Sequence, residues 1–398
     1  MKKEGSISGD KRILKIITCV ILILFSIEYL GYNNISVYRV GIFPLLIVGC
    51  LFISGKPKYN YVNLMIMLMI IYLFLYAFCL AYLGDNIMFP LFSIPLVYYF
   101  FSFWGLKTPI KIDYAKIFVW YSLPHIVSHI LGDHNFHGTG RFMGLNNDPN
   151  FCGIFLVFSI VSAIFLLRRK KTPFYQIIIY SLLLFYALFL LFLTGSRGAM
   201  LSLLLLLFVE FWKSKINKIW KLSITILLVV FILRVYDYIL TLPDWVSPDV
   251  SRIDSVLCRF KPDSMADGSN RTEQWAKILR AFEYQNSIFT PLGNNNVGMK
   301  GTYSHNTFID FLIENGVFLG TIFLCSFLFA IIETIRKSNS IRLKSPEEWE
   351  FLYISYALML QLFFLSAISQ KIFWLSLIYI IFLGFRKSHL YINSFQNR

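Results

Sequence analysis

Two long apolar runs joined by six residues decide the fold. The first run extends from Tyr175 to Leu193 (YQIIIYSLLLFYALFLLFL) and the second from Met200 to Trp212 (MLSLLLLLFVEFW), with TGSRGA at 194–199 between them. A helix of about 20 apolar residues, rising 1.5 Å per residue, crosses the roughly 30 Å hydrocarbon core of a bilayer. We therefore predict two membrane helices joined by a tight turn, which places Arg197 at a membrane surface. A guanidinium there either snorkels to water or marks a site.

Composition places the whole chain among polytopic membrane proteins, because 57% of its 398 residues are hydrophobic and only 15% are charged. Apolar stretches recur along its length. We predict an all-α membrane helix bundle that forms a single domain over residues 1–398. It has about twelve transmembrane helices, centred near residues 22, 45, 72, 95, 123, 159, 184, 205, 230, 325, 359 and 378.

The distribution of Lys and Arg predicts the orientation, since short cytoplasmic loops retain positive charge. With both termini in the cytoplasm, the inner segments carry most of the 37 Lys and Arg residues. The short outer loops then keep only Arg39, Arg141, Arg197 and Lys371, and residues 241–304 form one long extracytoplasmic loop between spans nine and ten. We interpret the formal net charge of +15 as an orientation signal, and the partners that we expect include no nucleic acid.

A polar segment precedes the sixth apolar run, with the sequence GRFMGLNNDPN at 140–150. Aspartate followed by proline is a strong signal for a helix start, since the carboxylate caps free amides and proline fits the first helical position. We predict a helix beginning at Pro149, approached through a glycine hinge. Arg141 is a cation that this helix start does not explain.

The long outer loop contains a second helix signal. Asn270 to Glu273 fits a capping box, and an apolar stripe at helical spacing follows, made of Trp275, Ile278, Leu279 and Phe282. We predict an amphipathic helix along the membrane surface. Arg271 falls in its first turn, where the helix dipole disfavours a cation unless an anion binds nearby.

The loop ends at a third helix start, which Ser304 or Asn306 can cap, with Asp310 and Glu314 four residues apart on one face. The positive end of the helix dipole disfavours protonation of His305, which lies between the two capping candidates. A neutral imidazole is a usable general base, so His305 is a catalytic candidate besides a capping or packing residue.

Metal chemistry is not indicated. His125 and His129 lie four apart in the fifth span, and Asp133, His134 and His137 follow at its outer end, but no zinc signature accompanies them. The six cysteines show neither a disulfide framework nor a zinc spacing. We predict no metal site, and interpret these imidazoles as residues that line an outer vestibule.

The sequence resembles the O-antigen polymerase and O-antigen ligase superfamily, bacterial membrane glycosyltransferases that use undecaprenyl-diphosphate-linked glycans. The resemblance covers roughly residues 140–335, and the first 130 residues match only as generic spans. Four segments in the family order carry it: Arg141 to Asn150, the turn at 194–199, Arg271 to Trp275, and His305-Asn306 followed by Gly316 and Gly320.

This resemblance implies a metal-independent enzyme without a cofactor, in the bacterial cytoplasmic membrane with its active site on the outer side. Arg197 and Arg271 resemble arginines thought to grip the donor diphosphate, and His305 resembles the histidine expected to activate the acceptor hydroxyl. Arg141, Asn150 and Asn306 are then candidates for substrate binding. The implied partners are an undecaprenyl-diphosphate-linked donor, a glycan or lipid-linked glycan acceptor, membrane lipid, a chain-length regulator and a flippase.

Three activities fit the sequence. We favour a repeat-unit polymerase, since Leu319 stands where a ligase often has a small or polar residue. A ligase that transfers finished polymer to lipid A-core or another acceptor is the alternative, because the chain has one long outer loop where several polymerases have two. A lipid-linked oligosaccharide flippase is the third reading, but a transporter would show two similar halves and charges at mid-membrane.

Overall fold

The structure is a computed structural model that describes residues 3–27, 31–32, 35–53, 60–84, 88–106, 109–132, 140–146, 148–213, 217–243, 252–261, 271–285, 291, 304–365 and 371–386. The chain forms two compact units. Unit 1 contains Met1–Phe118 and Gln274–Arg398, and unit 2 contains Val119–Glu273. The single membrane domain stays a prediction.

The helical fold class is confirmed, and a helix covers each of the twelve predicted centres. Within the described residues, five helices are long and apolar enough to cross a membrane: Tyr61–Tyr82, Pro149–Leu167, Phe174–Thr194, Lys218–Thr241 and Thr307–Lys344. Three shorter apolar helices are Arg39–Phe52, Pro90–Trp104 and Lys371–Phe385. The number of spans and their orientation stay predictions.

Unit 1 is a helix bundle with one short strand pair, in which Gly31 pairs with Ser36 and Tyr32 with Ile35. Its elements are α1 (Lys3–Leu24), η1 (Phe25–Ile27), β1 (Gly31–Tyr32), β2 (Ile35–Ser36), η2 (Tyr38–Ile42), α2 (Phe43–Phe52), α3 (Asn60–Tyr82), α4 (Met88–Trp104), α5 (Tyr114–Phe118), α13 (Arg271–Gln285), which enters unit 1 at Gln274, α14 (Thr307–Lys344), α15 (Pro346–Gln361), η7 (Leu362–Phe364) and α16 (Lys371–Phe385).

The core of unit 1 surrounds α16, whose residues from Ile372 to Gly384 are all buried. A helix that is apolar on every side needs neighbours on every side, and α4, α14 and α15 supply them. Aromatic rings fill the contact. Tyr379 stacks on Phe351 with ring centroids 4.1 Å apart, and Trp104 donates from its indole to the Tyr114 hydroxyl at 2.9 Å. The polar atoms of these large side chains are thus satisfied inside the core.

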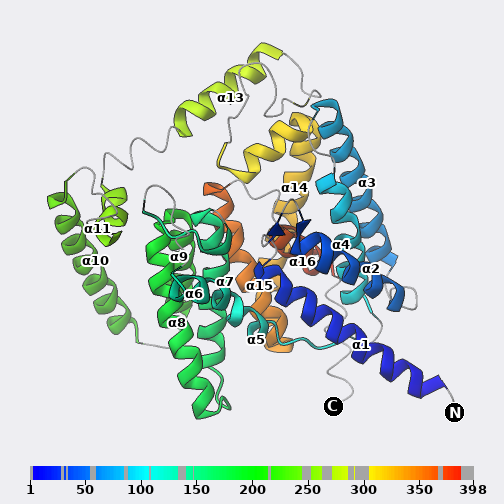
Figure 1. Cartoon of the computed structure of the whole chain (residues 1–398), viewed down its shortest axis with the longest axis horizontal. Coiled ribbons are helices and arrows are strands. Elements are labelled where there is room, and N and C mark those ends of the chain that lie inside the picture. Colours follow the sequence, from blue (N-terminus) through cyan, green and yellow to red (C-terminus); the bar gives the residue numbers. More distant parts are fainter. Residues whose placement is uncertain are drawn as a thin grey trace. The chain divides into compact units, whose positions relative to one another are not determined.

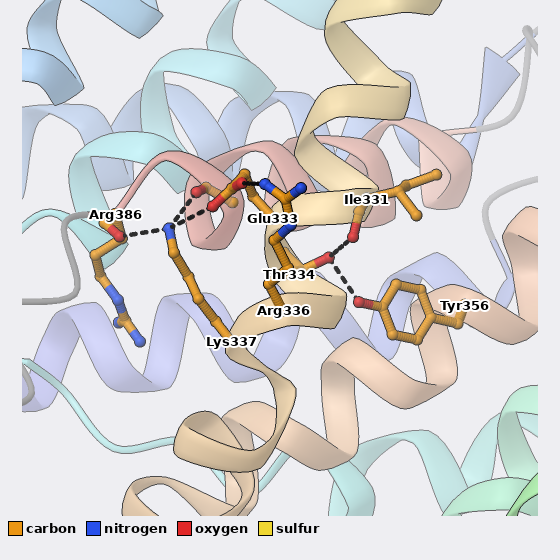
Figure 2. Close-up of polar contacts among 8 residues, drawn as sticks. Ile331, Glu333, Thr334, Arg336, Lys337, Tyr356 and Arg386 are labelled. Atoms are coloured by element: carbon orange, nitrogen blue, oxygen red, sulfur yellow. Dashed lines mark hydrogen bonds and ion pairs between the residues drawn. The ribbon is translucent and has the colours of Figure 1, made fainter.

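Basic residues fasten one end of this bundle (Figure 2). Lys337 of α14 donates to the backbone oxygens of Gly384 and Arg386 at the end of α16, and Tyr356 of α15 donates to Thr334 Oγ1 at 2.6 Å. Arg386 forms a two-pronged pair with Glu348, at 2.9 and 2.6 Å. Cations stabilise the negative end of a helix dipole. Lys337 and Arg386, which lie in segments predicted to be cytoplasmic, therefore also join α14, α15 and α16.

Unit 2 is built on α7, whose residues are buried over most of its length. Its elements are η3 (Val119–Ser122), α6 (Leu123–Ile130), η4 (Gly144–Asn146), α7 (Pro149–Leu167), α8 (Phe174–Thr194), α9 (Arg197–Lys213), α10 (Lys218–Thr241), α11 (Arg252–Leu257) and η5 (Cys258–Phe260). Figure 1 shows α7, α8 and α9 side by side. A Cβ on Gly153 would lie 2.8 Å from the Cβ of Ala199, so small residues let α7 and α9 approach closely.

The predicted fifth span is not one continuous helix. α5 is followed by the 3-10 segment η3, and α6 restarts with Pro124 in its first turn. Proline lacks an amide donor and breaks a helix that it interrupts. Ser159 of α7 donates its hydroxyl to the Val119 carbonyl oxygen, which satisfies a backbone group of this irregular segment.

α14 bends sharply at Gly316, which has φ 76° and ψ 161° inside the helix. The bend packs residues 307–315 against the start of residues 317–344. The rings of Phe311 and Phe323 stack at 4.5 Å, and a Cβ on Gly320 would lie 2.8 Å from the Phe311 carbonyl oxygen. Figure 1 shows the shorter segment set at an angle to the longer one. The tenth predicted span therefore corresponds to the second segment alone.

The bend makes Gly316 irreplaceable, since its backbone angles are almost exclusive to glycine. We expect Gly316→Ala to destabilise the protein by about 1–3 kcal/mol. Thr321→Ala, on an exposed position of the same helix, is the control. Thermal unfolding of the detergent-purified protein measures both variants, and equal midpoints for Gly316→Ala and the wild type would contradict the bend.

Candidate functional site

The predicted turn between the two apolar runs is confirmed. α8 ends at Thr194, Gly195 adopts the left-handed conformation with φ 55°, and α9 begins at Arg197. The Gly195 amide donates to the Phe192 carbonyl oxygen at 2.9 Å, and the Ser196 amide donates to Thr194 Oγ1 at 3.2 Å. Glycine fits this C-terminal position because it has no Cβ to clash. The turn thus sets Arg197 at the amino end of α9.

Arg141 is the cation that holds this turn in place. Its guanidinium is buried, with 8% of the residue exposed. Nε donates to the Thr194 carbonyl oxygen at 2.7 Å, and Nη2 donates to Asn150 Oδ1 at 3.1 Å. The Thr194 carbonyl belongs to the last turn of α8, where backbone acceptors lack helical partners and the dipole is negative. The structure thereby gives a structural role to Arg141, a cation that the sequence alone left unexplained.

Asn150 completes the same network. Asp148 caps α7 as predicted, accepting from the amides of Asn150 and Phe151 at 2.6 and 3.2 Å. This cap fixes the first turn of α7, and Asn150 Oδ1 then accepts from Ser196 Oγ at 3.1 Å as well as from Arg141. Two candidate substrate-binding residues, Arg141 and Asn150, are therefore brought to the turn that carries Arg197.

A third arginine, which the sequence reasoning missed, lies at this turn. A Cβ on Gly195 would be 3.5 Å from Arg259 Cδ and 3.6 Å from Arg141 Nε. Arg197 Nη1 lies 3.5 Å from the Arg259 carbonyl oxygen, a long contact. Arg259 belongs to η5, and its neighbour Cys258 donates from Sγ to the Pro243 carbonyl oxygen at 3.2 Å. Sequence spacing gives no signal for such a long-range contact.

The arrangement suits an anion. Arg141, Arg197 and Arg259 surround one turn, and α9 begins there with backbone amides that lack helical partners. Guanidinium groups present planar, paired donors that match phosphate oxygens. We name these three residues the arginine turn. Arg141 is tied to the backbone of the turn, whereas the Arg197 side chain is half-buried and starts the helix.

Unit 1 carries the other predicted group, around His305. Asn306 caps α14, accepting on its side-chain oxygen from the amides of Phe308 and Ile309 at 3.0 and 3.3 Å. The cap confirms the predicted helix start. The Asn306 side-chain oxygen is thus bonded to the helix. The role of Asn306 in substrate binding stays a prediction. His305 immediately precedes the cap and has φ 52°, which is left-handed.

The amphipathic helix of the long loop is confirmed as α13, which begins at Arg271. Asn270 and the side chains of Arg271, Leu279 and Phe282 lie outside the described part of the structure. The described part of the apolar stripe packs on α14. Ile278 and Ile313 are both buried, and Trp275, Ala281 and Ile309 pack around them. Protein contacts thus cover part of the face predicted to lie on the membrane.

The two described histidines of the predicted fifth span, His125 and His129, have structural contacts. His125 Nδ1 accepts from the Leu145 amide at 3.3 Å, and Gly144 packs so closely that a Cβ there would lie 2.3 Å from that nitrogen. His129 Nδ1 forms a hydrogen bond with the Tyr186 hydroxyl at 2.9 Å. Residues 133–139 lie outside the described residues. Among those that are described, no group of three or more His, Cys, Asp or Glu could hold a metal ion.

A family model described as O-antigen ligase matches residues 182–324. Residues 182–324 are thus similar to an O-antigen ligase domain. This confirms the resemblance to the O-antigen polymerase and ligase superfamily, whose members are glycosyltransferase-like enzymes of the membrane. The matched residues include the turn, Arg271, His305 and Gly316. The segment from Arg141 to Asn150 lies before the match, yet its side chains bond directly to the turn. None of the curated proteins matches the chain.

The contacts of Arg141 give a test that needs no substrate. We expect Arg141→Ala to lower the stability of the protein by about 1–3 kcal/mol, because it removes the side-chain donor to the Thr194 carbonyl oxygen and one of the two donors to Asn150 Oδ1. Arg141→Lys should restore only part of this loss, since an ammonium lacks the planar fork.

Arg234→Ala is the matched control, because Arg234 is 82% exposed and pairs only weakly with Asp237 at 4.0 Å. Thermal unfolding in detergent measures all three variants. If Arg141→Ala unfolds at the same temperature as Arg234→Ala, Arg141 does not hold the turn.

Proposed function

We propose that the protein is a repeat-unit polymerase of surface polysaccharide. It transfers a glycan from undecaprenyl diphosphate to a sugar hydroxyl of another lipid-linked oligosaccharide, at the outer face of the bacterial cytoplasmic membrane. The observation that supports this proposal most is the arginine turn, of which Arg197 and Arg259 lie within the match to the O-antigen ligase family and Arg141 bonds to the matched segment. A cluster of guanidinium groups at a helix start suits a diphosphate.

The donor diphosphate is bound by the arginine turn in this proposal. Arg197 donates to the diphosphate oxygens, and Arg259 adds a second guanidinium from the neighbouring η5. Arg141 and Asn150 hold the turn and thereby position Arg197. Arg271, at the start of α13, remains a further candidate for the diphosphate, as the resemblance implies.

The reaction is a single displacement at the anomeric carbon of the donor. The acceptor oxygen forms a bond to C1 while the bond from C1 to the phosphate oxygen breaks, and undecaprenyl diphosphate leaves with the electron pair. The hydroxyl proton passes to the His305 imidazole. The arginines stabilise the negative charge that develops on the leaving diphosphate, and such electrostatic stabilisation is usually the largest catalytic effect. No cofactor takes part in this scheme, and metal independence is part of the proposal.

Two observations bear on the kind of acceptor. Leu319 occupies a position where a small or polar residue is frequent in ligases, which favours the polymerase. The one long outer segment that we predict at 241–304 favours a ligase, which would use the same donor site and lipid A-core or another acceptor. The two enzymes therefore differ on the acceptor side, and the arginine turn serves both.

The products of the purified protein distinguish these functions. We expect a ladder of glycan lengths when the protein is incubated with an undecaprenyl-diphosphate-linked repeat unit, and electrophoresis or mass spectrometry resolves the ladder. A single transfer to an added lipid A-core acceptor would show the ligase. Movement of the lipid across vesicles without any new glycosidic bond would contradict both enzymes and support the flippase.

The two groups of residues have separable effects on transfer. We expect His305→Ala to slow transfer about 10²–10⁴-fold, through loss of the general base. Arg197→Lys should slow it about 10²-fold or more, because a lysine cannot make the paired hydrogen bonds. Arg234→Lys, on an exposed side chain, is the control for the second change. Initial rates of the purified variants test these expectations, and near-normal rates for His305→Ala and Arg197→Lys would refute the mechanism.

Arg259 is tested by binding, independently of chemistry. We expect Arg259→Ala to weaken undecaprenyl diphosphate about 10–100-fold, the loss of one or two hydrogen bonds to a charged group. Undecaprenyl monophosphate should lose less, since it offers fewer oxygens. Fluorescence titration of both lipids in nanodiscs gives the ratio. An unchanged diphosphate affinity would remove Arg259 from the donor site.

A further inference from the structure

The backbone of His305 is held in an unfavourable conformation. Among the described residues, His305 is the one non-glycine residue with a positive φ, at 52°. The left-handed region costs an ordinary residue about 1–2 kcal/mol. Such a conformation persists only where the surrounding contacts determine it, and it is typical of functional sites. The contacts that fix it lie on both neighbours of the histidine.

Ser304, on one side, is fully buried and bonded in three directions. Its carbonyl oxygen accepts from Trp275 Nε1 of α13 at 2.8 Å. Its hydroxyl oxygen accepts from the Asn306 amide at 3.0 Å. The hydroxyl proton faces the carboxylate of Asp310 and, at 2.7 Å, the Asn306 carbonyl oxygen. A hydroxyl has one proton, and the bond to a carboxylate is the stronger of the two.

Asn306, on the other side, is fixed by the helix that it caps. Its side-chain oxygen accepts from two amides of α14, and its carbonyl oxygen accepts from the Asp310 amide at 3.0 Å. Asp310 is buried in the first turn of α14, where the positive end of the dipole stabilises a carboxylate. Asp310 therefore contacts both neighbours of His305: its carboxylate accepts from Ser304, and its amide donates to Asn306.

We propose that Asp310 is a positioning residue for His305 and that Asp310 acts through the Ser304 hydroxyl. Asp310, Ser304 and Trp275 together hold the two flanking residues, so that the imidazole is directed before any substrate binds. The inference rests on the proposed role of His305 as general base. A base that is oriented in advance loses less freedom when the proton is transferred, which raises kcat.

The other acidic residue of this short segment has a different contact. Glu314, one turn further along, is bonded to the Tyr76 hydroxyl of α3, and the next residue, Asn315, accepts from the Tyr72 hydroxyl at 3.3 Å. These bonds anchor the far end of residues 307–315 on α3. The segment is thereby held at both ends, and the contacts at its amino end reach the residues beside His305.

The first test separates positioning from folding by rates. We expect Asp310→Ala to lower kcat for glycan transfer about 10–100-fold, with the KM for the donor changed less than about twofold, since general-base catalysis contributes 10²–10⁴-fold in total. Asp310→Asn keeps an oxygen acceptor for the Ser304 hydroxyl, so it should recover most of the loss. Ser304→Ala should resemble Asp310→Ala.

Thr307→Val is the matched control. Thr307 is also fully buried at this helix start, but the acceptor of its hydroxyl is the Leu365 carbonyl oxygen. Its removal should cost similar stability and leave kcat of the folded protein within a few fold of the wild type. If Thr307→Val loses as much kcat as Asp310→Ala, or if Asp310→Ala keeps its kcat, the positioning role is wrong.

A second test bypasses the tethered imidazole. Glycine accepts a positive φ, so His305→Gly removes the side chain while relaxing the backbone. With added imidazole, we expect His305→Gly and the double variant His305→Gly/Asp310→Ala to reach the same transfer rate, because no side chain remains to position. A further loss of rate in the double variant would overturn the proposal. The proposal would also be overturned if imidazole restored no activity and Asp310→Asn transferred glycan at the same rate as Asp310→Ala. Full activity of His305→Gly without imidazole would instead refute the proposed function.

Discussion

The hydrogen bond from Arg141 to the Thr194 carbonyl is the interaction on which unit 2 depends most. It joins the loop before α7 to the end of α8, where an apolar helix leaves its last carbonyls without partners. Asn150 and Ser196 extend the bond into a small network, and Gly195 turns the chain within it. Arg197 starts α9 from that fixed point. The hydrogen bonds of Arg141 offset the cost of burying a cation, and in the proposed function the turn that it holds positions Arg197 for the donor diphosphate.

Unit 1 also holds a polar segment beside an apolar helix, but it does so with a bend inside the helix. A polar segment must be held at the start of an apolar helix, and the bend at Gly316 lets residues 307–315 form a short helix of their own. Tyr72 and Tyr76 anchor its far end, while Asn306, Ser304 and Asp310 satisfy its near end. Because these polar groups have hydrogen-bond partners within the protein, the irregular backbone is tolerable in an apolar surrounding. His305 is presented at the amino end of this short helix.

The sequence predicted those features that have local signals. The helix starts at Pro149 and after Asn306 follow from a capping residue and its neighbours, and the turn at Gly195 follows from glycine between two apolar runs. α13 was predicted from its stripe, although the described part of that stripe packs on α14. By contrast, Arg259 and the Ser304-Asp310 contact depend on the folded backbone. The sequence also did not predict the bend at Gly316 and the break at Pro124, since the apolar composition on both sides of each residue is that of one continuous span.

The central claim is that the arginine turn binds the diphosphate of a lipid-linked glycan. An experimental structure of the protein with undecaprenyl diphosphate bound in a nanodisc tests it most directly. The account predicts diphosphate oxygens within about 2.7–2.9 Å of the Arg197 guanidinium, with the bond from Arg141 to the Thr194 carbonyl intact. A diphosphate bound away from this turn, with Arg197 still directed at the Arg259 carbonyl oxygen, would contradict it.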